Sequence, residues 1–247
     1  MKINLKTVLI VLLTEVLIIA GIAVNIQAKE EENAKQTIAA KVKEMTSVDV
    51  ESVEKTPIDG IYEIVAGKGN IIFYYVPKNE LIIFGEIYDK NKKSLTQEKR
   101  DQIQAGKIKD IPLDKAIIIG TGKNKVIEFS DPDCPYCRKA ALYFKDKNVT
   151  KYVYLIPIPQ LHPKAEEKTK YILAAGDRAK AYYEVMSGAK DKDDLSNQKV
   201  SKEANDLYQY QQNIGSRVGI NGTPVFWING KYVPGANMKM FDALLEK

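Results

Sequence analysis

Apolar and polar positions alternate in blocks along the N-terminal third of this chain. An apolar run covers Val8–Val24, and apolar residues then recur at helical spacing over Glu32–Met45. Two runs rich in β-branched and aromatic residues follow, Asn70–Val76 and Leu81–Tyr88, joined by the turn Pro77–Glu80. This pattern predicts a helix and a small sheet, which bury too little core to be stable alone and therefore suit a dimer.

The C-terminal half alternates strands with helices. Strands are predicted at Ala116–Ile119, Lys125–Phe129 and Lys151–Ile156, with an amphipathic helix after the second. A helical insertion at about 163–218 then interrupts the strand pattern, and Gln211 weakens the apolar face of its last helix. A further strand, a hairpin and a closing helix follow. This order of elements predicts an α/β layered domain.

Breaks between these patterns predict the domain organisation. The polar segment Lys90–Lys109 separates the two halves and is expected to form a linker helix. Four parts are predicted: a signal peptide or membrane anchor at 1–28, an N-terminal dimerisation domain at 29–90, the linker helix at 91–110, and a catalytic domain with the insertion at 111–247.

The N-terminal apolar run is typical of a secretory signal or a membrane anchor. It follows two lysines, and it contains Glu15, which disfavours a stable span. A tolerable cleavage site ends at Ala28, so we expect export with cleavage there. Retention in the inner membrane through residues 8–24 is the alternative. Both outcomes place the body of the protein outside the cytoplasm, where disulfides form.

Charge excludes one class of partner. The 37 basic and 32 acidic residues are spread along the chain and leave a net charge of +5. No basic block with interleaved aromatic residues is present, so we expect no nucleic-acid partner. The chain has a single histidine, His162, for which a plain surface or packing role is expected because neither metal ligands nor a catalytic triad can be assembled around it.

Chemistry is predicted at Cys134 and Cys137, the two cysteines of the chain, which stand in the sequence Cys-Pro-Tyr-Cys. This spacing puts one thiol at the start of a helix and the other one turn later, so the pair can close into a disulfide or open into a dithiol. Pro135 fits the first helical turn. The helix N-terminus would stabilise a thiolate at Cys134, which makes Cys134 the attacking sulfur and Cys137 its resolving partner.

Two other uses of the cysteine pair remain as alternatives. Half of a zinc site is one, although zinc takes about four ligands and His162 alone remains to add to the two thiols. An inert structural disulfide is the other, although so short a loop removes little chain entropy.

Acidic residues surround the motif. Glu128 interrupts an otherwise apolar strand, and it is interpreted either as a proton acceptor that helps to deprotonate Cys137 or as a strand-end residue that reaches solvent. Asp131 and Asp133 are expected to be turn and capping residues whose charge opposes thiolate formation.

The strand, cysteine motif and helix resemble the active-site region of the thioredoxin superfamily. Gly219–Gly230 resembles the loop, strand and hairpin that carry the cis-proline of that fold, which implies a cis bond before Pro224. Further segments resemble the periplasmic disulfide isomerases DsbC and DsbG and their N-terminal dimerisation domain: Phe129–Lys139, Ile156–Pro159, Val233–Gly235, Pro57–Ile64 and Leu81–Asp89.

The resemblance implies a thioredoxin-like fold with a helical insertion, preceded by a small α+β (cystatin-like) dimerisation domain. It also implies a periplasmic homodimer that isomerises or reduces incorrect disulfides in misoxidised or unfolded exported proteins. Thr223 and Pro224 would align the client backbone beside Cys134, while Pro135 and Tyr136 would touch the client. A redox-active Cys134–Cys137 disulfide would need no further cofactor, and a membrane electron donor of the DsbD or CcdA type would keep it reduced.

Two departures from that family leave other functions open. DsbC and DsbG carry an apolar residue at the position of Glu128, where this chain is closer to thioredoxin and to the oxidase DsbA. The second, structural cysteine pair of some DsbC proteins is absent. A DsbA-like oxidase, a dedicated thiol reductase and a holdase chaperone whose thiols matter little therefore remain alternatives.

Overall fold

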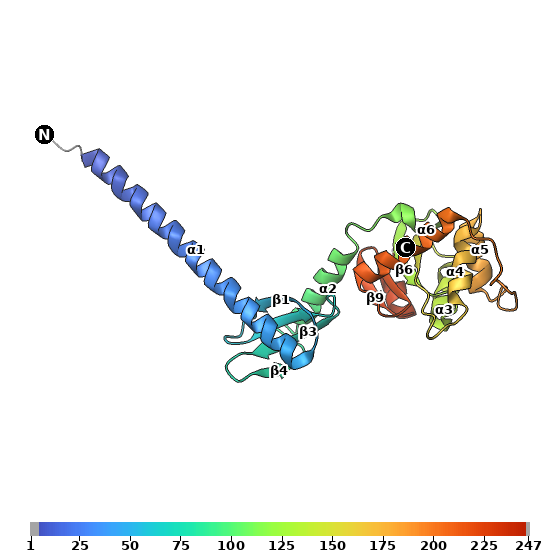
Figure 1. Ribbon diagram of the computed structural model, residues 1–247, viewed down its shortest axis with the longest axis horizontal. Coiled ribbons are helices and arrows are strands. Elements are labelled where there is room, and N and C mark those ends of the chain that lie inside the picture. The colour runs from blue at the N-terminus through green and yellow to red at the C-terminus, as the bar shows by residue number, and fades with distance from the viewer. Residues whose placement is uncertain (1–4, 246–247) are drawn as a thin grey trace. The chain divides into compact units, whose positions relative to one another are not determined.

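The computed structural model describes the backbone of residues 5–245 and the side chains of residues 25–245 (Figure 1). The chain forms two compact units, and the boundary between them in the sequence lies between Ile87 and Tyr88. Among the residues with described side chains, no helix is long and apolar enough to cross a membrane. The apolar run at 8–24, predicted as a signal or anchor, lies outside that range.

The first unit is a long helix followed by a four-stranded antiparallel meander in the order β1-β2-β3-β4. Its elements are α1 (Leu5–Thr46), β1 (Val50–Lys55), β2 (Tyr62–Ala66), β3 (Ile71–Val76) and β4 (Leu81–Ile83). The predicted amphipathic helix is confirmed within α1, where Ile38 and Val42 are buried against Ile64 and Phe73 of the sheet. This helix therefore covers one face of the meander.

The predicted strand Leu81–Tyr88 is wrong in its second half. β4 pairs with β3 only from Leu81 to Ile83, and the chain then leaves the sheet. Gly85 lies two residues beyond the end of β4, and a glycine inside an edge strand has no side chain to pack and weakens the pairing. Tyr88 forms an isolated bridge with Ser94 instead.

The second unit has a five-stranded sheet in the order β5-β7-β6-β8-β9. Its elements are α2 (Leu95–Lys107), η1 (Leu113–Lys115), β5 (Ile117–Ile119), β6 (Asn124–Ser130), α3 (Pro135–Phe144), β7 (Val149–Leu155), α4 (Ala165–Ala174), α5 (Arg178–Met186), α6 (Lys202–Val218), β8 (Val225–Ile228), β9 (Lys231–Pro234) and α7 (Met238–Leu244). β6 and β7 are parallel, and every other pair is antiparallel. This confirms the predicted α/β layers.

Alternation along β6 divides the core between the two faces of this sheet. Val126 and Glu128 face the side packed by α3, α5 and α7, whereas Ile127 and Phe129 face the side packed by α6. The hairpin predicted at Asn229-Gly230 is confirmed between β8 and β9, with positive φ angles of 49° and 83°. The sheet therefore presents Glu128 to the helices that carry the cysteines and the insertion.

Two polar contacts fix helices onto this sheet. Trp227 Nε1 of β8 donates to the Gln104 carbonyl of α2 at 2.9 Å. The helix α2, which lies in the segment predicted as a linker helix, is therefore bonded to the sheet of the second unit. Gln211 is the polar residue that was predicted to weaken the apolar face of α6. It is fully buried, accepts from Leu155 N at 2.9 Å and donates to the Lys115 carbonyl at 2.7 Å, so both polar groups of its amide are satisfied.

Candidate active site

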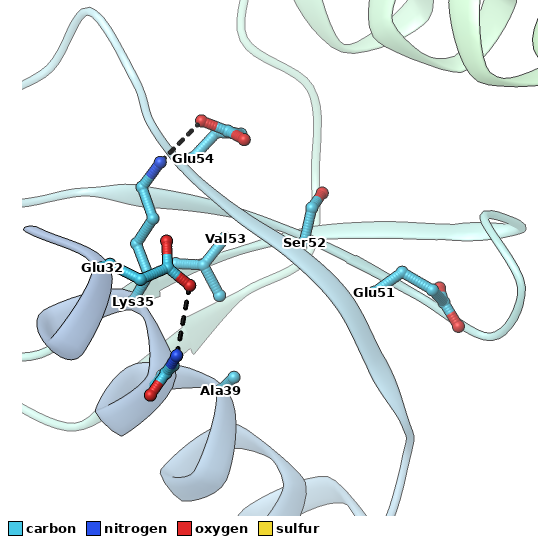
Figure 2. A pocket seen from close by; sticks show the side chains of 8 residues that line it. Glu32, Lys35, Ala39, Glu51, Ser52, Val53 and Glu54 are labelled. Atoms are coloured by element: carbon cyan, nitrogen blue, oxygen red, sulfur yellow. Dashed lines mark hydrogen bonds and ion pairs between the residues drawn. The ribbon is translucent and has the colours of Figure 1, made fainter. Parts of the chain in front are cut away.

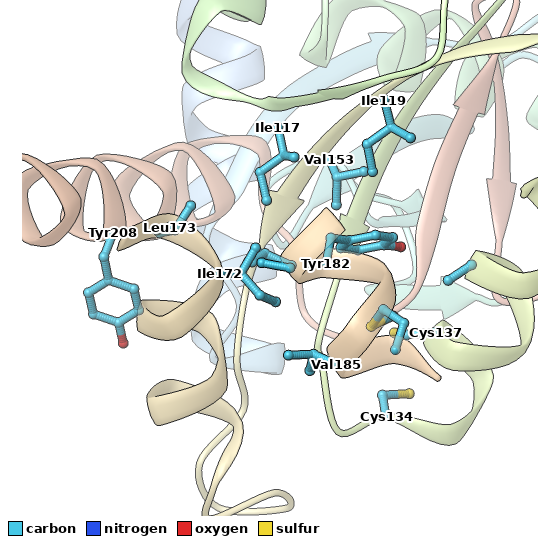
Figure 3. Close-up of a cluster of buried hydrophobic side chains, with 14 of the residues drawn as sticks. Ile117, Ile119, Cys134, Cys137, Val153, Ile172, Leu173, Tyr182, Val185 and Tyr208 are labelled. Carbon is cyan, nitrogen blue, oxygen red and sulfur yellow. The ribbon is translucent and has the colours of Figure 1, made fainter. Parts of the chain in front are cut away.

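Cys134 is the N-cap residue of α3, in the place that the sequence predicted. Its backbone is extended, with φ −69° and ψ 121°, and Pro135 occupies the first helical position. The Cys134 N–H donates to the Asp131 carbonyl at 3.2 Å, which closes the turn after β6. Figure 3 shows both cysteines at one end of a buried cluster, beside Tyr182 and Val185 of α5.

The surroundings of Cys134 favour its thiolate. A hydrogen bond from the Cys137 side chain lowers the pKa of Cys134 to about 6, and the backbone N–H groups of Tyr136 and Cys137 act in the same direction. Burial and the charge of Asp131 oppose this shift. With a pKa near 6, about nine tenths of Cys134 is thiolate at pH 7.

Cys137 is held in the opposite state. It is fully buried, and burial raises the pKa of its thiol far above the ordinary value, with a further increase from its hydrogen bond to Cys134. The Asp131 N–H donates to its Sγ at 3.3 Å. Both cysteines are free thiols in this structure, so the disulfide between them stays a prediction.

The remaining predicted contact residues lie around Cys134. The Thr223–Pro224 peptide bond is cis, as the resemblance implied. The Thr223 carbonyl accepts from Cys134 Sγ at 3.5 Å. Pro135 is exposed, and Tyr136 is 66% exposed. The Thr223 carbonyl therefore contacts the Cys134 sulfur, and the two residues that follow Cys134 in the sequence are exposed.

Glu128 does not reach solvent, so that interpretation is wrong. Its side chain is fully buried, and Lys151 Nζ, also fully buried, lies 2.7 Å from its Oε2. The Tyr182 hydroxyl donates to Glu128 Oε1 at 3.1 Å, and Lys151 Nζ lies 3.3 Å from that hydroxyl. A buried carboxylate is thus held by a charge partner and a phenol.

Tyr182 links this group to the thiols. Burial first, and then the charges of Glu128 and Cys137, raise the pKa of Tyr182 well above its usual range. Lys151 and Tyr182 were not singled out from the sequence. A lysine inside the predicted strand next to β6 was the signal that could have found Lys151, because a buried strand carries a charge only where it has a partner.

Asp131 has the turn role that was predicted, because its Oδ1 accepts from Asp133 N at 2.8 Å. It is also fully buried, and its Oδ2 accepts from Ile158 N at 2.7 Å. His162 Nδ1 lies 3.0 Å from the same Oδ2. The surface or packing role expected for His162 stays a prediction, and the structure adds that the imidazole is paired with a carboxylate beside the cysteines.

A second ion network ties the cysteine turn to the helical insertion. Arg138 of α3 contacts Asp133 at 2.8 Å and binds both carboxylate oxygens of Asp191 at 2.7 Å. Lys168 of α4 contacts Asp191 at 2.6 Å and Asp133 as well. The insertion therefore fixes the turn immediately before Cys134.

Two further observations concern possible metal sites and a pocket of the first unit. Within residues 25–245 no group of three or more histidine, cysteine or acidic residues is arranged to hold a metal ion. Figure 2 shows a pocket between α1 and β1 of the first unit. Its polar side chains bond to one another, with Lys35 donating to Glu54 at 3.2 Å and Gln36 to Glu32 at 3.2 Å.

Comparison with known families gives two matches. Residues 111–247 match the thioredoxin-like domain, and residues 25–97 match the disulfide bond isomerase protein N-terminal domain. Together these two matches cover most of the chain, and the first overlaps residues 91–97 of the segment predicted as a linker.

Curated relatives carry one recurrent name. The probable thiol:disulfide interchange protein DsbC of Bordetella pertussis is 28% identical over 193 residues, which span 76% of this chain and 65% of that protein. The thiol:disulfide interchange protein DsbC of Escherichia coli K12 is 25% identical over 216 residues, 84% of each chain. Among solved structures, a disulfide interchange protein from Neisseria gonorrhoeae is 30% identical, with a TM-score of 0.47 over 56% of this chain and all of that one.

Proposed function

Because the chain belongs to the thioredoxin-like domain family and its residues 25–97 match the N-terminal domain of disulfide bond isomerases, we propose that it is a thiol:disulfide interchange enzyme. Its clients would be misoxidised or unfolded exported proteins, whose incorrect disulfides it isomerises or reduces. The single observation that carries this proposal is the difference in acidity between the two thiols. Cys134 ionises near pH 6, whereas Cys137 is buried and protonated.

The first step of the proposed reaction uses the Cys134 thiolate. It attacks one sulfur of a client disulfide, so that a Cys134–client disulfide forms and the other client sulfur leaves as a thiolate. Isomerisation follows when a client thiolate displaces Cys134, with no net transfer of electrons. Reduction follows when Cys137 attacks the Cys134 sulfur, which leaves the client with two thiols and the enzyme with a Cys134–Cys137 disulfide.

Glu128 is proposed as the group that receives the Cys137 proton in the reductive branch. Cys137 needs such a partner because its thiol is buried, and the thiolate is the nucleophile. Tyr182 supports this role, because its hydroxyl bonds to Glu128 while its pKa responds to the charges of both Glu128 and Cys137. Lys151 would hold the carboxylate in position, because its ammonium group lies 2.7 Å from Glu128 Oε2.

Client contacts are proposed at the exposed side of Cys134. The Thr223 carbonyl lies within 3.5 Å of the sulfur and precedes the cis-proline Pro224. An extended client segment could pair with this backbone, while Pro135 and the exposed Tyr136 ring pack against its side chains.

The proposed setting is the periplasm, with export directed by the N-terminal segment and cleavage after Ala28. The N-terminal domain, predicted at 29–90, would join two copies into a homodimer. Repeated turnover in the reductive branch would require a membrane electron donor of the DsbD or CcdA type, because each client reduction leaves the cysteines oxidised.

Trapping of the mixed disulfide tests the order of the two sulfurs. A peptide with one disulfide is added to the reduced Cys137→Ala variant, and the products are separated without reductant. We expect an adduct at Cys134 to accumulate, because Cys137 is absent and only the freed thiol of the peptide can displace Cys134. Cys134→Ser is the matched control and should give none. An equal yield of adduct through Cys137 in that control would overturn the proposed order.

A DsbA-like oxidase is the second candidate, and the low pKa of Cys134 favours it. A stabilised thiolate stabilises the dithiol form, which makes the disulfide a stronger oxidant. Equilibration with glutathione separates the two functions, since about 30 mV corresponds to tenfold in the equilibrium constant. A potential close to that of DsbA would favour the oxidase.

A further inference from the structure

The Asp131 carboxylate is buried beside both thiols. Its backbone N–H donates to Cys137 Sγ at 3.3 Å, and its carbonyl accepts from Cys134 N at 3.2 Å. The carboxylate itself accepts from the backbone N–H groups of Asp133 and Ile158. These donors stabilise the carboxylate but carry no charge, so they do not cancel the repulsion between the carboxylate and a thiolate at Cys134.

His162 brings a titratable group to the same carboxylate. Its Nδ1 lies 3.0 Å from Asp131 Oδ2, and its side chain is 21% exposed, so it can exchange protons with water. An imidazole changes its charge between pH 5 and 8. Cys134 ionises in this same range, with its pKa near 6.

The basic groups around the cysteine turn have other partners. Arg138 feels the charge of Asp131, but its guanidinium is bonded to Asp133 and Asp191, and these carboxylates raise its pKa further. Lys168 is bonded to the same two carboxylates. These charges therefore do not follow the pH changes that protonate an imidazole.

The groups on the sheet side of the thiols are also paired. Glu128 of β6 is bonded to Lys151 of β7, and Tyr182 of α5 has a pKa raised well above its usual range. Of the side chains named here, His162 is the one that contacts the Asp131 carboxylate and belongs to a residue type that can change charge between pH 5 and 8.

We propose that His162 is a positioning residue for the thiol chemistry, which controls through Asp131 how much of Cys134 is held as thiolate. Protonated His162 compensates the carboxylate, so Asp131 opposes the thiolate less. Neutral His162 leaves that opposition in full. As the pH falls, the surroundings therefore become more favourable to the thiolate, and Cys134 should titrate over a broader range than an isolated group.

This inference rests on the role proposed for Cys134 as the attacking sulfur, but its tests measure ionisation and not client repair. A failure of the coupling would leave the interchange function untouched. A protein without interchange activity could still show the coupling.

The first test follows the His162 ring protons by NMR across pH 5–8 in reduced protein prepared without a histidine tag. The chain has a single histidine, so the signals need no assignment. Linkage requires the thiolate to raise the midpoint of the imidazole as much as the imidazolium lowers that of Cys134. We expect the midpoint to be about half a unit higher in the wild type than in Cys134→Ser. Equal midpoints would overturn the proposal.

The second test follows thiolate absorbance at 240 nm in reduced His162→Gln, which keeps a hydrogen-bond donor but has no titratable ring. We expect the Cys134 midpoint to rise by about half a unit and the curve to narrow to a single ionisation. Lys164→Gln removes an exposed charge two residues away and should leave the midpoint unchanged. Near-UV circular dichroism checks that each variant is folded. If His162→Gln does not fold, the NMR comparison of the wild type with Cys134→Ser decides whether the proposal holds.

The same substitution in an Asp131→Asn background tests the route. Without the carboxylate the imidazole has no partner that favours its protonation, so His162→Gln should move the Cys134 midpoint by less than about a third of its effect in the wild type. An undiminished shift would contradict action through Asp131, and a downward shift in the Asp131-containing protein would contradict the proposed sign.

Discussion

Removal of one partner of the buried ion pair should destabilise the protein strongly. Lys151→Met replaces the cation with an apolar side chain of similar length and leaves Glu128 charged at a site with no exposure. Breaking a buried pair in this way costs about 3–5 kcal/mol. The hydrogen bond from Tyr182 to Glu128 remains and contributes about 1 kcal/mol, so we expect a loss near the lower limit, about 3 kcal/mol at pH 7.

The matched control removes both charges. Glu128→Leu combined with Lys151→Met fills the same space with apolar side chains, which in other buried pairs is neutral or stabilising. The double variant also leaves the buried Tyr182 hydroxyl without its acceptor, so we expect a loss of about 1–2 kcal/mol relative to the wild type, smaller than that of the single variant.

Urea denaturation of the reduced proteins at pH 7 measures these differences. The slope with urea should stay the same in all three proteins, so that the midpoints report stability. A loss below about 1 kcal/mol in Lys151→Met at pH 7, or an equal loss in the double variant, would refute the claim that the buried Glu128 carboxylate depends on Lys151 as its charge partner.

Three further outcomes are expected. The rate of alkylation of Cys134 by iodoacetamide should fall about tenfold from its plateau to pH 5, since the pKa of Cys134 lies near 6; a midpoint above pH 8 would contradict a stabilised thiolate. Gln211→Leu leaves the Leu155 N–H and the Lys115 carbonyl unpaired and should cost about 2–4 kcal/mol by urea denaturation, whereas a loss below about 0.5 kcal/mol would show that water replaces the amide. Light scattering should give the mass of a dimer at micromolar concentration, and a monomer mass would count against the proposed isomerase.

The order of elements followed from the sequence because it depends on local patterns. Strands alternate with helices at the predicted places, and the Asn229-Gly230 turn needed only its own residues to be recognised. The cis bond before Pro224 was different, because it was expected from the family resemblance and not from periodicity. Cys134 at the helix N-terminus followed from the Pro135 beside it.

The partners of the charged residues could not be predicted in the same way. Glu128 meets Tyr182 across 54 positions of sequence, and Asp131 meets His162 across 31. Such pairs depend on how the sheet and the insertion pack against each other, and no periodic pattern in the sequence predicts them. The early end of β4 was missed for a related reason, because an apolar run shows where a strand is favourable but not where its partner strand stops.

Recovery of activity by a scrambled, multi-disulfide test enzyme is the most direct test of the proposed function. The reduced protein is added in catalytic amounts, and recovery is compared with that given by Cys134→Ser and Cys137→Ala. We expect rapid recovery with the wild type, none above background with Cys134→Ser, and partial recovery with Cys137→Ala, because client thiols can still displace Cys134. Full recovery with Cys134→Ser would contradict the mechanism, and no recovery with the wild type, together with fast oxidation of a reduced client by its disulfide form, would establish an oxidase instead.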